Sequence, residues 1–395
     1  MKRRTKLYQW NDERVPNAQY KYLYRKMLDE ETIRKAWKEL RKGKTKRKSV
    51  QNIDSNFDEE VRKMREMIRN TKPKGYRIDR PDLTYCPPAK RITKIVNERG
   101  KRRKANIADI REQWYFHIIV IVLKPIVLKR ISKHSCGSIP KRGAHSGKRY
   151  LESAIRKGDN VRYFLKTDIR HFYDNLRIDI VIRELRKDIA DELFLYCISR
   201  IYMYVPKGIL IGLYISPWLA NYVLCRLDHI IERTMNTTST RYMDDVSVFA
   251  NSKKMLFALL RNMKIELGRL RLRLKRTYQV CRFDYRGKGR PLDFMGFLFF
   301  RNKTVMRKKI MLSATRSARM FKRAKEKGRR FYIKAIRGFL SRIGWLKHTD
   351  SYNCYKKHIK PYVNIGVLKA IVSRIDKEGA EYGNMENRNL FGEAC

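Results

Sequence analysis

Two adjacent aspartates in a β-forming stretch constrain the fold of this chain more than any other feature. In RYMDDVSVFA, residues 241–250, Val246 and Val248 alternate with polar or aromatic residues after the pair. This alternation predicts a short hairpin with Asp244 and Asp245 at its turn. Adjacent carboxylates repel each other, so we expect a cation or a positively charged group beside them.

The charge balance indicates what the chain binds. The 395 residues include 93 Lys and Arg against 39 Asp and Glu, which gives a formal net charge of +54. A chain this basic repels itself unless a polyanion compensates, so nucleic acid is the leading partner. The alternatives are a solvated basic surface without a ligand, and a membrane surface, which would need a basic amphipathic helix.

Other features argue against several classes of protein. No run of about 18 uncharged apolar residues is present, so we expect no membrane span and no membrane partner, and residues 116–128 predict a buried helix instead. The N-terminus lacks the apolar segment of a secretory signal. The seven cysteines are scattered without a C-x-x-C pair, which argues against a zinc site and favours free thiols in a cytoplasmic protein.

A third carboxylate, Asp168, ends an apolar strand predicted at residues 163–165, and only folding can bring it to Asp244. Two strands that each present carboxylates at one end form a site for hard divalent cations. Two Mg²⁺ ions, with Mn²⁺ as a substitute, suit in-line displacement at phosphorus, where one ion activates a 3′-hydroxyl and the other steadies the leaving pyrophosphate. The alternative is that Asp168 caps a helix beginning near Phe172 and that the paired aspartates form an ordinary polar turn.

The order of predicted elements indicates an α+β fold with separate lobes. Polar-faced helices up to residue 75 precede a basic hairpin at 90–110, and a mixed core of strands and helices follows. Residues 312–375 predict basic helices, and the Glu-, Gly- and Asn-rich end of the chain predicts a loose tail.

Several motifs, in order along the chain, resemble those of reverse transcriptases. The Tyr-Met-Asp-Asp hairpin resembles their catalytic hairpin, and KTDIRHFYD, residues 166–174, resembles their first palm motif. Residues 212–228, GLYISPWLANYVLCRLD, resemble the second palm motif, and residues 292–300, LDFMGFLFF, resemble the primer-grip hairpin. Residues 103–113 together with residues 122–155 are similar to the fingers motifs of bacterial and group II intron-like enzymes.

The resemblance implies a right-hand polymerase fold with fingers, a palm containing an antiparallel sheet, and a helical thumb. The implied division is an N-terminal helical extension (1–75), fingers (76–160, with part of 180–215), palm (161–305), thumb (306–375) and flexible tail (376–395). In the thumb, aromatic residues alternate with Lys and Arg, a pattern that suits contact with the phosphates of a duplex. The residues of this pattern include Phe321, Arg329, Arg330, Phe331, Tyr332 and Trp345.

The resemblance also implies residue roles. The metal ligands would be the carboxylates of Asp168, Asp244 and Asp245 together with the backbone carbonyl of Ile169. Lys275 would be a catalytic residue that protonates the departing pyrophosphate.

Further implied roles concern the nucleotide and the nucleic acid. Arg103, with Lys104 beside it, would bind the triphosphate, and Tyr173 would exclude a 2′-hydroxyl; the alternatives are a generic basic loop and core packing. The loop that supports the template base and the new pair would be shaped by Gly212, Ser216 and Pro217. Primer or template contacts would come from Arg142, Tyr242, Met243, Met295 and Gly296.

One position departs from the intron-type pattern. Those enzymes usually carry Gln-Gly where this chain has Ile211–Gly212, and the apolar residue resembles reverse transcriptases of diversity-generating retroelements, which misincorporate opposite adenine. Loss of a glutamine hydrogen bond would loosen checking of the template–nucleotide pair, so Ile211 is the candidate fidelity residue. Pro217, where that subclass usually has Gln, makes the sequence a hybrid of the two patterns.

The resulting expectation is an RNA-directed DNA polymerase that extends a primer with dNTPs on an RNA template, in a diversity-generating retroelement. Its expected partners are a template RNA, the RNA–DNA hybrid and a small accessory protein. The alternatives are a phage-defence reverse transcriptase, protein-primed or template-independent, and a noncatalytic RNA-binding scaffold.

Overall fold

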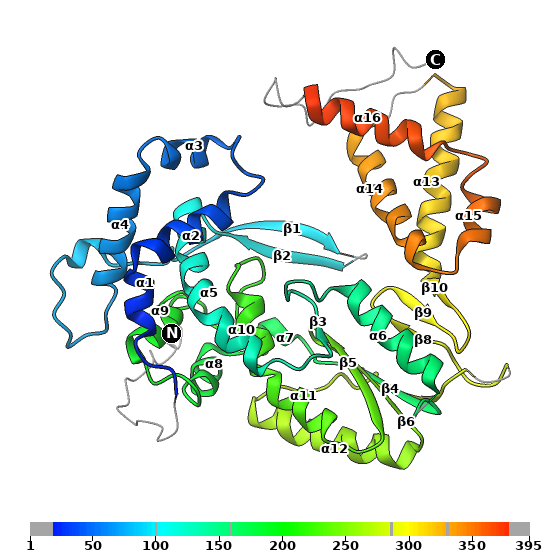
Figure 1. The fold of residues 1–395 in the computed structure, drawn as a ribbon, viewed down its shortest axis with the longest axis horizontal. Coiled ribbons are helices and arrows are strands. Elements are labelled where there is room, and N and C mark those ends of the chain that lie inside the picture. The colour runs from blue at the N-terminus through cyan, green and yellow to red at the C-terminus, as the bar shows by residue number, and fades with distance from the viewer. Residues whose placement is uncertain (1–18, 99–100, 159, 285–286, 329–331, 379–395) are drawn as a thin grey trace, which may run out of the picture. The chain divides into compact units, whose positions relative to one another are not determined.

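The computed structural model describes residues 19–98, 101–158, 160–284, 287–328 and 332–378 (Figure 1). The chain divides into two compact units, the first formed by 1–143, 167–246 and 257–278, and the second by 144–166, 247–256 and 279–395. This division by packing cuts across the expected fingers, palm and thumb, whose boundaries stay predictions. The first 18 residues of the expected N-terminal extension lie outside the described residues, as do 379–395 of the expected tail.

The described part of the N-terminal extension is helical, as predicted. Its helices are α1 (Leu23–Leu28), α2 (Glu30–Arg41), α3 (Lys48–Asp54) and α4 (Phe57–Asn70), and the short η1 (Pro81–Leu83) follows. Asp29 caps α2 by accepting a hydrogen bond from the Thr32 amide at 2.9 Å. The apolar face of α2 packs on α5 (Ile110–Arg130), where the rings of Trp37 and Trp114 lie 5.0 Å apart.

The basic hairpin is formed by β1 (Ile92–Glu98) and β2 (Lys101–Ile107), which pair antiparallel with Val96 opposite Arg103 (Figure 1). Helix α5 follows, and its residues 114–120 are all buried, which confirms the predicted buried helix. Within the described residues, no helix has the length and apolar character needed to cross a membrane.

A five-stranded sheet carries the predicted catalytic hairpin. Its strand order is β3-β5-β6-β4-β7, with β3 (Ser135–Cys136), β5 (Thr237–Tyr242), β6 (Asp245–Ala250), β4 (Tyr163–Asp168) and β7 (Gln279–Arg282). β3 runs parallel to β5 and β7 antiparallel to β4. Val246, Val248 and Phe249 of β6 are fully buried, so the strand that leads away from the paired aspartates is part of the core.

The remaining helices of the sheet region follow the predicted pattern. They are α7 (Phe172–Asn175), α8 (Ile178–Leu185), α9 (Glu192–Arg200), α10 (Ser216–Val223), α11 (Cys225–Glu232) and α12 (Lys253–Arg269). Six cysteines lie in the described residues and all are free thiols, as expected; Cys395 lies outside them.

The second unit contains α6 (Ala144–Lys157), a three-stranded sheet and a helical bundle. The small sheet has the order β10-β9-β8, with β8 (Leu292–Phe294), β9 (Phe297–Phe299) and β10 (Thr304–Met306). The bundle consists of α13 (Lys308–Glu326), α14 (Ile333–Gly344), η2 (Trp345–His348), α15 (Tyr352–His358) and α16 (Ile365–Glu378). Residues 376–378 therefore belong to a helix, whereas the sequence placed them in the tail.

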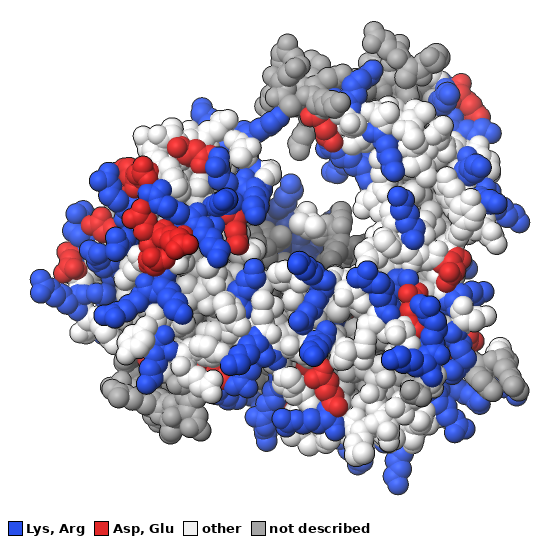
Figure 2. Space-filling model, in the orientation of Figure 1, with Lys and Arg blue, Asp and Glu red and all other residues white. Residues whose placement is uncertain are grey.

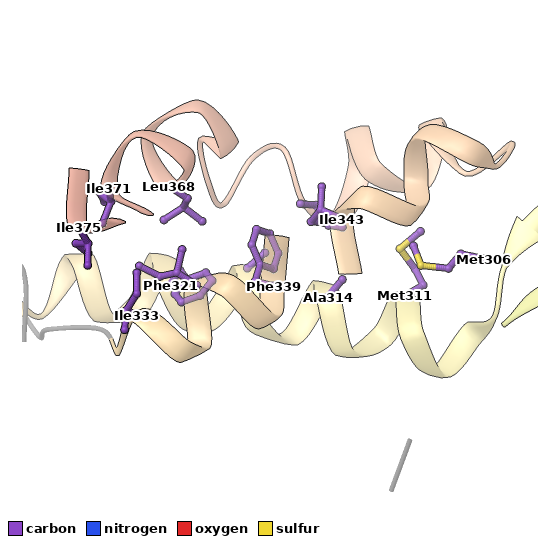
Figure 3. Packing of buried hydrophobic residues seen from close by; sticks show 13 residues of the cluster. Met306, Met311, Ala314, Phe321, Ile333, Phe339, Ile343, Leu368, Ile371 and Ile375 are labelled. Atoms are coloured by element: carbon purple, nitrogen blue, oxygen red, sulfur yellow. The ribbon is translucent and has the colours of Figure 1, made fainter. Parts of the chain in front are cut away.

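The bundle has a hydrophobic core of its own. Figure 3 shows Phe321 of α13, Phe339 of α14 and Leu368 of α16 pointing into this core, and the first two rings meet edge to face at 5.3 Å. Phe321 is thus a packing residue, while Tyr332 is 63% exposed and remains available to a ligand. The predicted contacts at Arg329, Arg330 and Phe331 lie outside the described residues.

Candidate catalytic site

Backbone hydrogen bonds join the end of β4 to two segments that are distant in sequence. The Ile169 amide donates to the Asp244 carbonyl at 3.2 Å, and the Lys275 amide donates to the Asp168 carbonyl at 2.8 Å. The chain therefore brings Asp168 and Asp244 to one place, as the sequence predicts. The capping alternative for Asp168 fails, because His171 is the N-cap of α7 and no side chain caps that helix.

The Asp168 carboxylate is only partly satisfied by the protein. The Lys275 ammonium contacts its Oδ2, while its Oδ1 is buried without a hydrogen-bond partner. An unpaired buried carboxylate oxygen costs free energy unless a donor or a cation reaches it. A hard divalent cation, which prefers oxygen ligands, fits this atom.

The charges around Asp244 oppose one another. Burial, and next the Asp168 carboxylate, raise the pKa of Asp244 above its usual value, while Arg103 and Lys275 act in the opposite direction. Two carboxylates that disfavour each other's charge form a site where a cation is stabilising. The positively charged groups expected near this turn are Arg103 and Lys275, which act on the Asp244 carboxylate.

Asp245 is placed differently from its neighbour. The sequence placed Asp244 and Asp245 at the hairpin turn, and this prediction was wrong by one residue. The turn lies at Met243 and Asp244, because Asp245 already pairs as the first residue of β6. Among the described residues, no group of three or more His, Cys, Asp and Glu side chains is arranged to hold a metal. The structure thus brings two of the three predicted carboxylates together, and the metal role of Asp245 stays a prediction.

The hairpin turn depends on a left-handed residue. Met243 has φ 57°, and its amide donates to the Cys136 carbonyl at 3.1 Å. A Cβ added at Gly137 would lie 2.9 Å from Cγ of Met243, so a glycine is needed at that position of the neighbouring strand end. These contacts fix the residue directly before Asp244.

A buried ion pair supports this turn, and sequence reasoning missed it. Both partners, Arg241 and Asp228, have side chains less than 5% exposed, and the guanidinium donates to the carboxylate at 2.6 and 2.7 Å. It also donates to the carbonyl of Met243 at 2.8 Å and to Oδ1 of Asn221 at 3.1 Å. Although burial opposes the charge, Asp228 raises the pKa of Arg241 above its usual value. The signal in the sequence was an arginine within the hairpin and an aspartate on the preceding helix.

Tyr173 lies near the carboxylates. Burial, and then the Asp244 charge, raise the pKa of its hydroxyl, and Arg103 opposes this rise. The Ile209 amide donates to the Tyr173 carbonyl at 2.9 Å. A Cβ at Gly208 would lie 2.4 Å from the same carbonyl, so the loop at 208–212 packs closely under Tyr173.

The other end of this loop is bonded to β2. The Asn106 amide and its side-chain Nδ2 both donate to the Ile211 carbonyl, at 2.7 and 3.1 Å. Gly212 has φ 105°, and a Cβ there would lie 2.4 Å from the Asn106 carbonyl oxygen. The loop therefore fixes the strand on which Arg103 and Lys104 are exposed, and Arg103 is close enough to influence both Asp244 and Tyr173.

Ser216 lies inside the protein, beneath the loop that it was expected to shape. Its side chain is fully buried, and its hydroxyl shares a hydrogen bond of 2.8 Å with the Tyr202 hydroxyl. Ser216 therefore supports the loop from inside, because its side chain is not exposed to a ligand. Pro217 occupies the first turn of α10, where its missing amide hydrogen costs nothing.

The predicted primer and template residues are distributed over both units. Arg142 donates from Nη1 to the Ser132 carbonyl at 3.0 Å and so braces its own loop. Met295 and Gly296 form the tight turn between β8 and β9 with φ 52° and 92°. Met295 is 3% exposed, so its side chain packs inward and any primer contact would come from the backbone. The roles of Arg142, Tyr242, Met243 and Gly296 stay predictions.

Comparisons with known proteins identify the family. The sequence model described as "Reverse transcriptase (RNA-dependent DNA polymerase)" matches residues 92–298. That range contains the β1–β2 hairpin, both carboxylate segments and the turn at Met295. The chain therefore belongs to the reverse transcriptase family, and this membership confirms the expected α+β right-hand polymerase fold.

Individual relatives are distant. An uncharacterized 91 kDa protein in the cob intron of Schizosaccharomyces pombe is 29% identical over 155 residues, covering 37% of this chain and 19% of that protein. A putative COX1/OXI3 intron 1 protein of Saccharomyces cerevisiae is 23% identical over 161 residues, covering 37% and 18%. The chain thus spans about a fifth of the length of these relatives, and the expected likeness to intron-encoded proteins is confirmed at this coarse level.

Telomerases are among the solved structures with a similar trace. The apo telomerase of Candida tropicalis aligns with a TM-score of 0.42 at 11% identity, over 62% of this chain and 51% of that one. Telomerase of Candida albicans, in complex with a fragment of telomeric RNA, aligns with a TM-score of 0.39 at 12% identity, over 74% and 62%.

Proposed function

We propose that this protein extends the 3′ end of a primer with dNTPs on an RNA template. The observation that carries the proposal is the joining of Asp168 and Asp244 at one strand end, with an unsatisfied carboxylate oxygen and a raised Asp244 pKa. Membership of the reverse transcriptase family supports the choice of reaction.

The residues present fit a site for divalent cations. Asp168 and Asp244 would hold them, with Asp245 and the Ile169 carbonyl as further ligands. When bound, two Mg²⁺ ions, or Mn²⁺ in their place, would lower the pKa of the primer hydroxyl and neutralise the leaving pyrophosphate. The protein itself supplies the preorganised carboxylates, because the backbone bonds at Ile169 and Lys275 fix them before substrate arrives.

Basic and aromatic residues would orient the incoming nucleotide. Arg103 offers a planar fork for the triphosphate, and Lys104 adds charge beside it. Tyr173, held from below by the loop at 208–212, would meet the sugar and exclude a 2′-hydroxyl. Lys275 pairs with Asp168 in the absence of substrate, and its ammonium would be a proton donor for the leaving pyrophosphate.

The formal net charge of +54 supports binding of an RNA–DNA hybrid through its phosphates. Figure 2 shows Lys and Arg side chains spread over the visible faces of both units, with few acidic side chains among them outside the N-terminal helices. Met295, Gly296 and Arg142 would contact primer or template within this surface.

We assign the biological setting to a diversity-generating retroelement, with a template RNA and a small accessory protein as partners in the cytoplasm. The support is Ile211, an apolar residue at the position where intron-type enzymes usually carry glutamine. Asn106 bonds the backbone carbonyl of Ile211, so this contact does not depend on the side chain at position 211. A phage-defence enzyme is the alternative. Sequencing of the product on a defined template decides, because the retroelement enzyme misincorporates opposite adenine and a template-independent enzyme polymerises without added RNA.

Primer extension with a labelled DNA primer on RNA tests the polymerase proposal. Asp168→Asn and Asp244→Asn are each expected to lower the rate about a thousandfold, which corresponds to roughly 4 kcal/mol of lost charge stabilisation. Asp179→Asn is the matched control, since Asp179 is an exposed partner of Arg177. Equal activity of all three variants and the wild type would contradict the proposal.

A further inference from the structure

The second unit contains a hollow lined by basic side chains that the proposed reaction does not use. This hollow, called here the α6 pocket, has a volume of about 530 Å³. It is formed by α6, by the turn after β9, and by η2 with the residues that follow it. Its lining residues are Lys148, Arg149, Glu152, Ile155, Arg156, Phe300, Arg301, Asn302, Lys303, Thr304, Lys347, His348, Thr349 and Asp350.

The α6 pocket is more basic than the chain as a whole. Six of its fourteen lining residues are Lys or Arg, compared with 93 of 395 in the sequence. Its two acidic residues already have partners: Glu152 forms an ion pair with Lys148 at 2.7 Å, and Asp350 accepts a hydrogen bond from the Thr304 amide at 2.7 Å. Most of the positive charge in the pocket is therefore left without compensation.

Three cations are placed to meet an anion. Arg149, Arg156 and Lys347 are exposed, and none forms an ion pair with another of the residues that the structure describes. Arg301 has a different role, because its guanidinium donates to the carbonyls of Asp284 and Val161, at 3.2 Å each. In Figure 2, blue side chains gather where α6 and β8 lie in Figure 1.

One aromatic side chain lines the pocket beside these charges. Phe300, the residue directly after β9, is half-buried and lines the pocket. The Lys303 ammonium lies 5.4 Å from the centroid of its ring. Cations that track phosphates beside an aromatic face are the pattern by which proteins bind single-stranded nucleic acid. The volume is within the range of pockets that enclose a small ligand, so an unpaired nucleotide fits, whereas a paired strand keeps its bases inside the duplex.

We propose that the α6 pocket binds an unpaired stretch of RNA, with Arg149, Arg156 and Lys347 on successive phosphates and one base against Phe300. The choice of RNA over other strands rests on the proposed function. Phe300 ends the segment that resembles the primer-grip hairpin, and Lys347 lies in the predicted thumb. No pocket residue is among the residues singled out for metal, nucleotide or primer contact, so we place the α6 pocket outside the proposed catalytic site, as a second RNA site.

The test compares two variants of the full chain that lose equal charge. The pocket variant is Arg149→Gln with Arg156→Gln and Lys347→Gln, and the control variant is Lys357→Gln with Lys360→Gln and Lys369→Gln, all exposed in the same unit. Binding of a fluorescent 12-nucleotide RNA is measured by anisotropy across salt concentrations. Three lost phosphate contacts flatten the slope of log K against log salt by about 2, and weaken binding about a hundredfold at 0.1 M salt. Equal losses in the control variant would overturn the proposal.

Lysine footprinting with an acetylating reagent and mass spectrometry locates the RNA. Lys347 and Lys303 are expected to be protected by the single strand, and Lys357 and Lys360 to stay reactive. Protection of Lys347 by a blunt RNA duplex, or by inorganic pyrophosphate at the same phosphate concentration, would overturn the assignment to an unpaired strand. The Asp168→Asn protein should show the same protection, because Asp168 does not line the α6 pocket. Loss of primer extension with protection retained concerns the polymerase proposal alone, and loss of protection with primer extension retained concerns the pocket alone.

Discussion

Replacement of Arg241 by methionine tests whether a buried ion pair positions the catalytic hairpin. Both partners are almost fully buried, and removal of one partner from such a pair costs about 3–5 kcal/mol, because the other charge stays buried and unpaired. For a unit of this size, that loss lowers the melting temperature by roughly 6–20 °C. Arg62→Met is the control, since the Arg62–Glu59 pair is exposed on the surface and is expected to contribute less than about 1 kcal/mol.

A second variant separates stability from positioning. Replacement of both Arg241 and Asp228 by apolar residues removes the unpaired charge, so most of the melting temperature should return. Primer extension should stay impaired, because the carbonyl of Met243 still lacks the guanidinium that fixes the turn before Asp244. The reasoning is refuted if Arg241→Met melts like Arg62→Met, or if the double variant recovers full activity along with its stability.

Three further outcomes are expected. The pKa of Asp244 is raised in the folded protein, so the folded state is stable while this carboxyl is protonated and loses stability as the pH rises through the folded pKa. Asp244→Asn removes that loss and should raise the melting temperature of the metal-free protein more at pH 8 than at pH 4. Equal shifts at the two pH values would count against the raised pKa. Gly212→Ala places a Cβ 2.4 Å from the Asn106 carbonyl at φ 105°, so we expect a loss of at least about 1–3 kcal/mol and a higher KM for dNTPs, measured against Gly268→Ala, where nothing lies within 4 Å. Tyr173→Ala should narrow the preference for dNTPs over rNTPs in single-nucleotide insertion while Phe172 keeps the core intact, and an unchanged preference would disprove the sugar contact.

The local elements of the fold were predictable from sequence because each depends on periodicity within a short window. Alternation gave the hairpin around Asp244, and a continuous apolar run gave the buried helix α5. The meeting of Asp168 with Asp244 was predictable from chemistry, since two carboxylates at strand ends in a basic chain have few other uses.

The buried polar contacts were not predictable in the same way. Arg241 and Asp228 look like two more charged residues in a chain that is one-third charged, and only tertiary packing shows that they pair inside the protein. The motif that contains Ser216 indicated a loop beside the site, but it did not show that the Ser216 hydroxyl bonds the buried Tyr202 hydroxyl. Solvent exposure depends on which neighbours cover a side chain, and a one-dimensional pattern does not contain that information.

The short peptide from Gly208 to Gly212 has a consequence for substrate choice. One end is bonded under Tyr173 and the other to the strand that carries Arg103. A change in the backbone of this peptide would therefore shift Tyr173 and the strand that carries Arg103 at the same time. Under the roles proposed for Tyr173 and Arg103, sugar preference and nucleotide affinity would therefore change together when one position of this peptide is substituted.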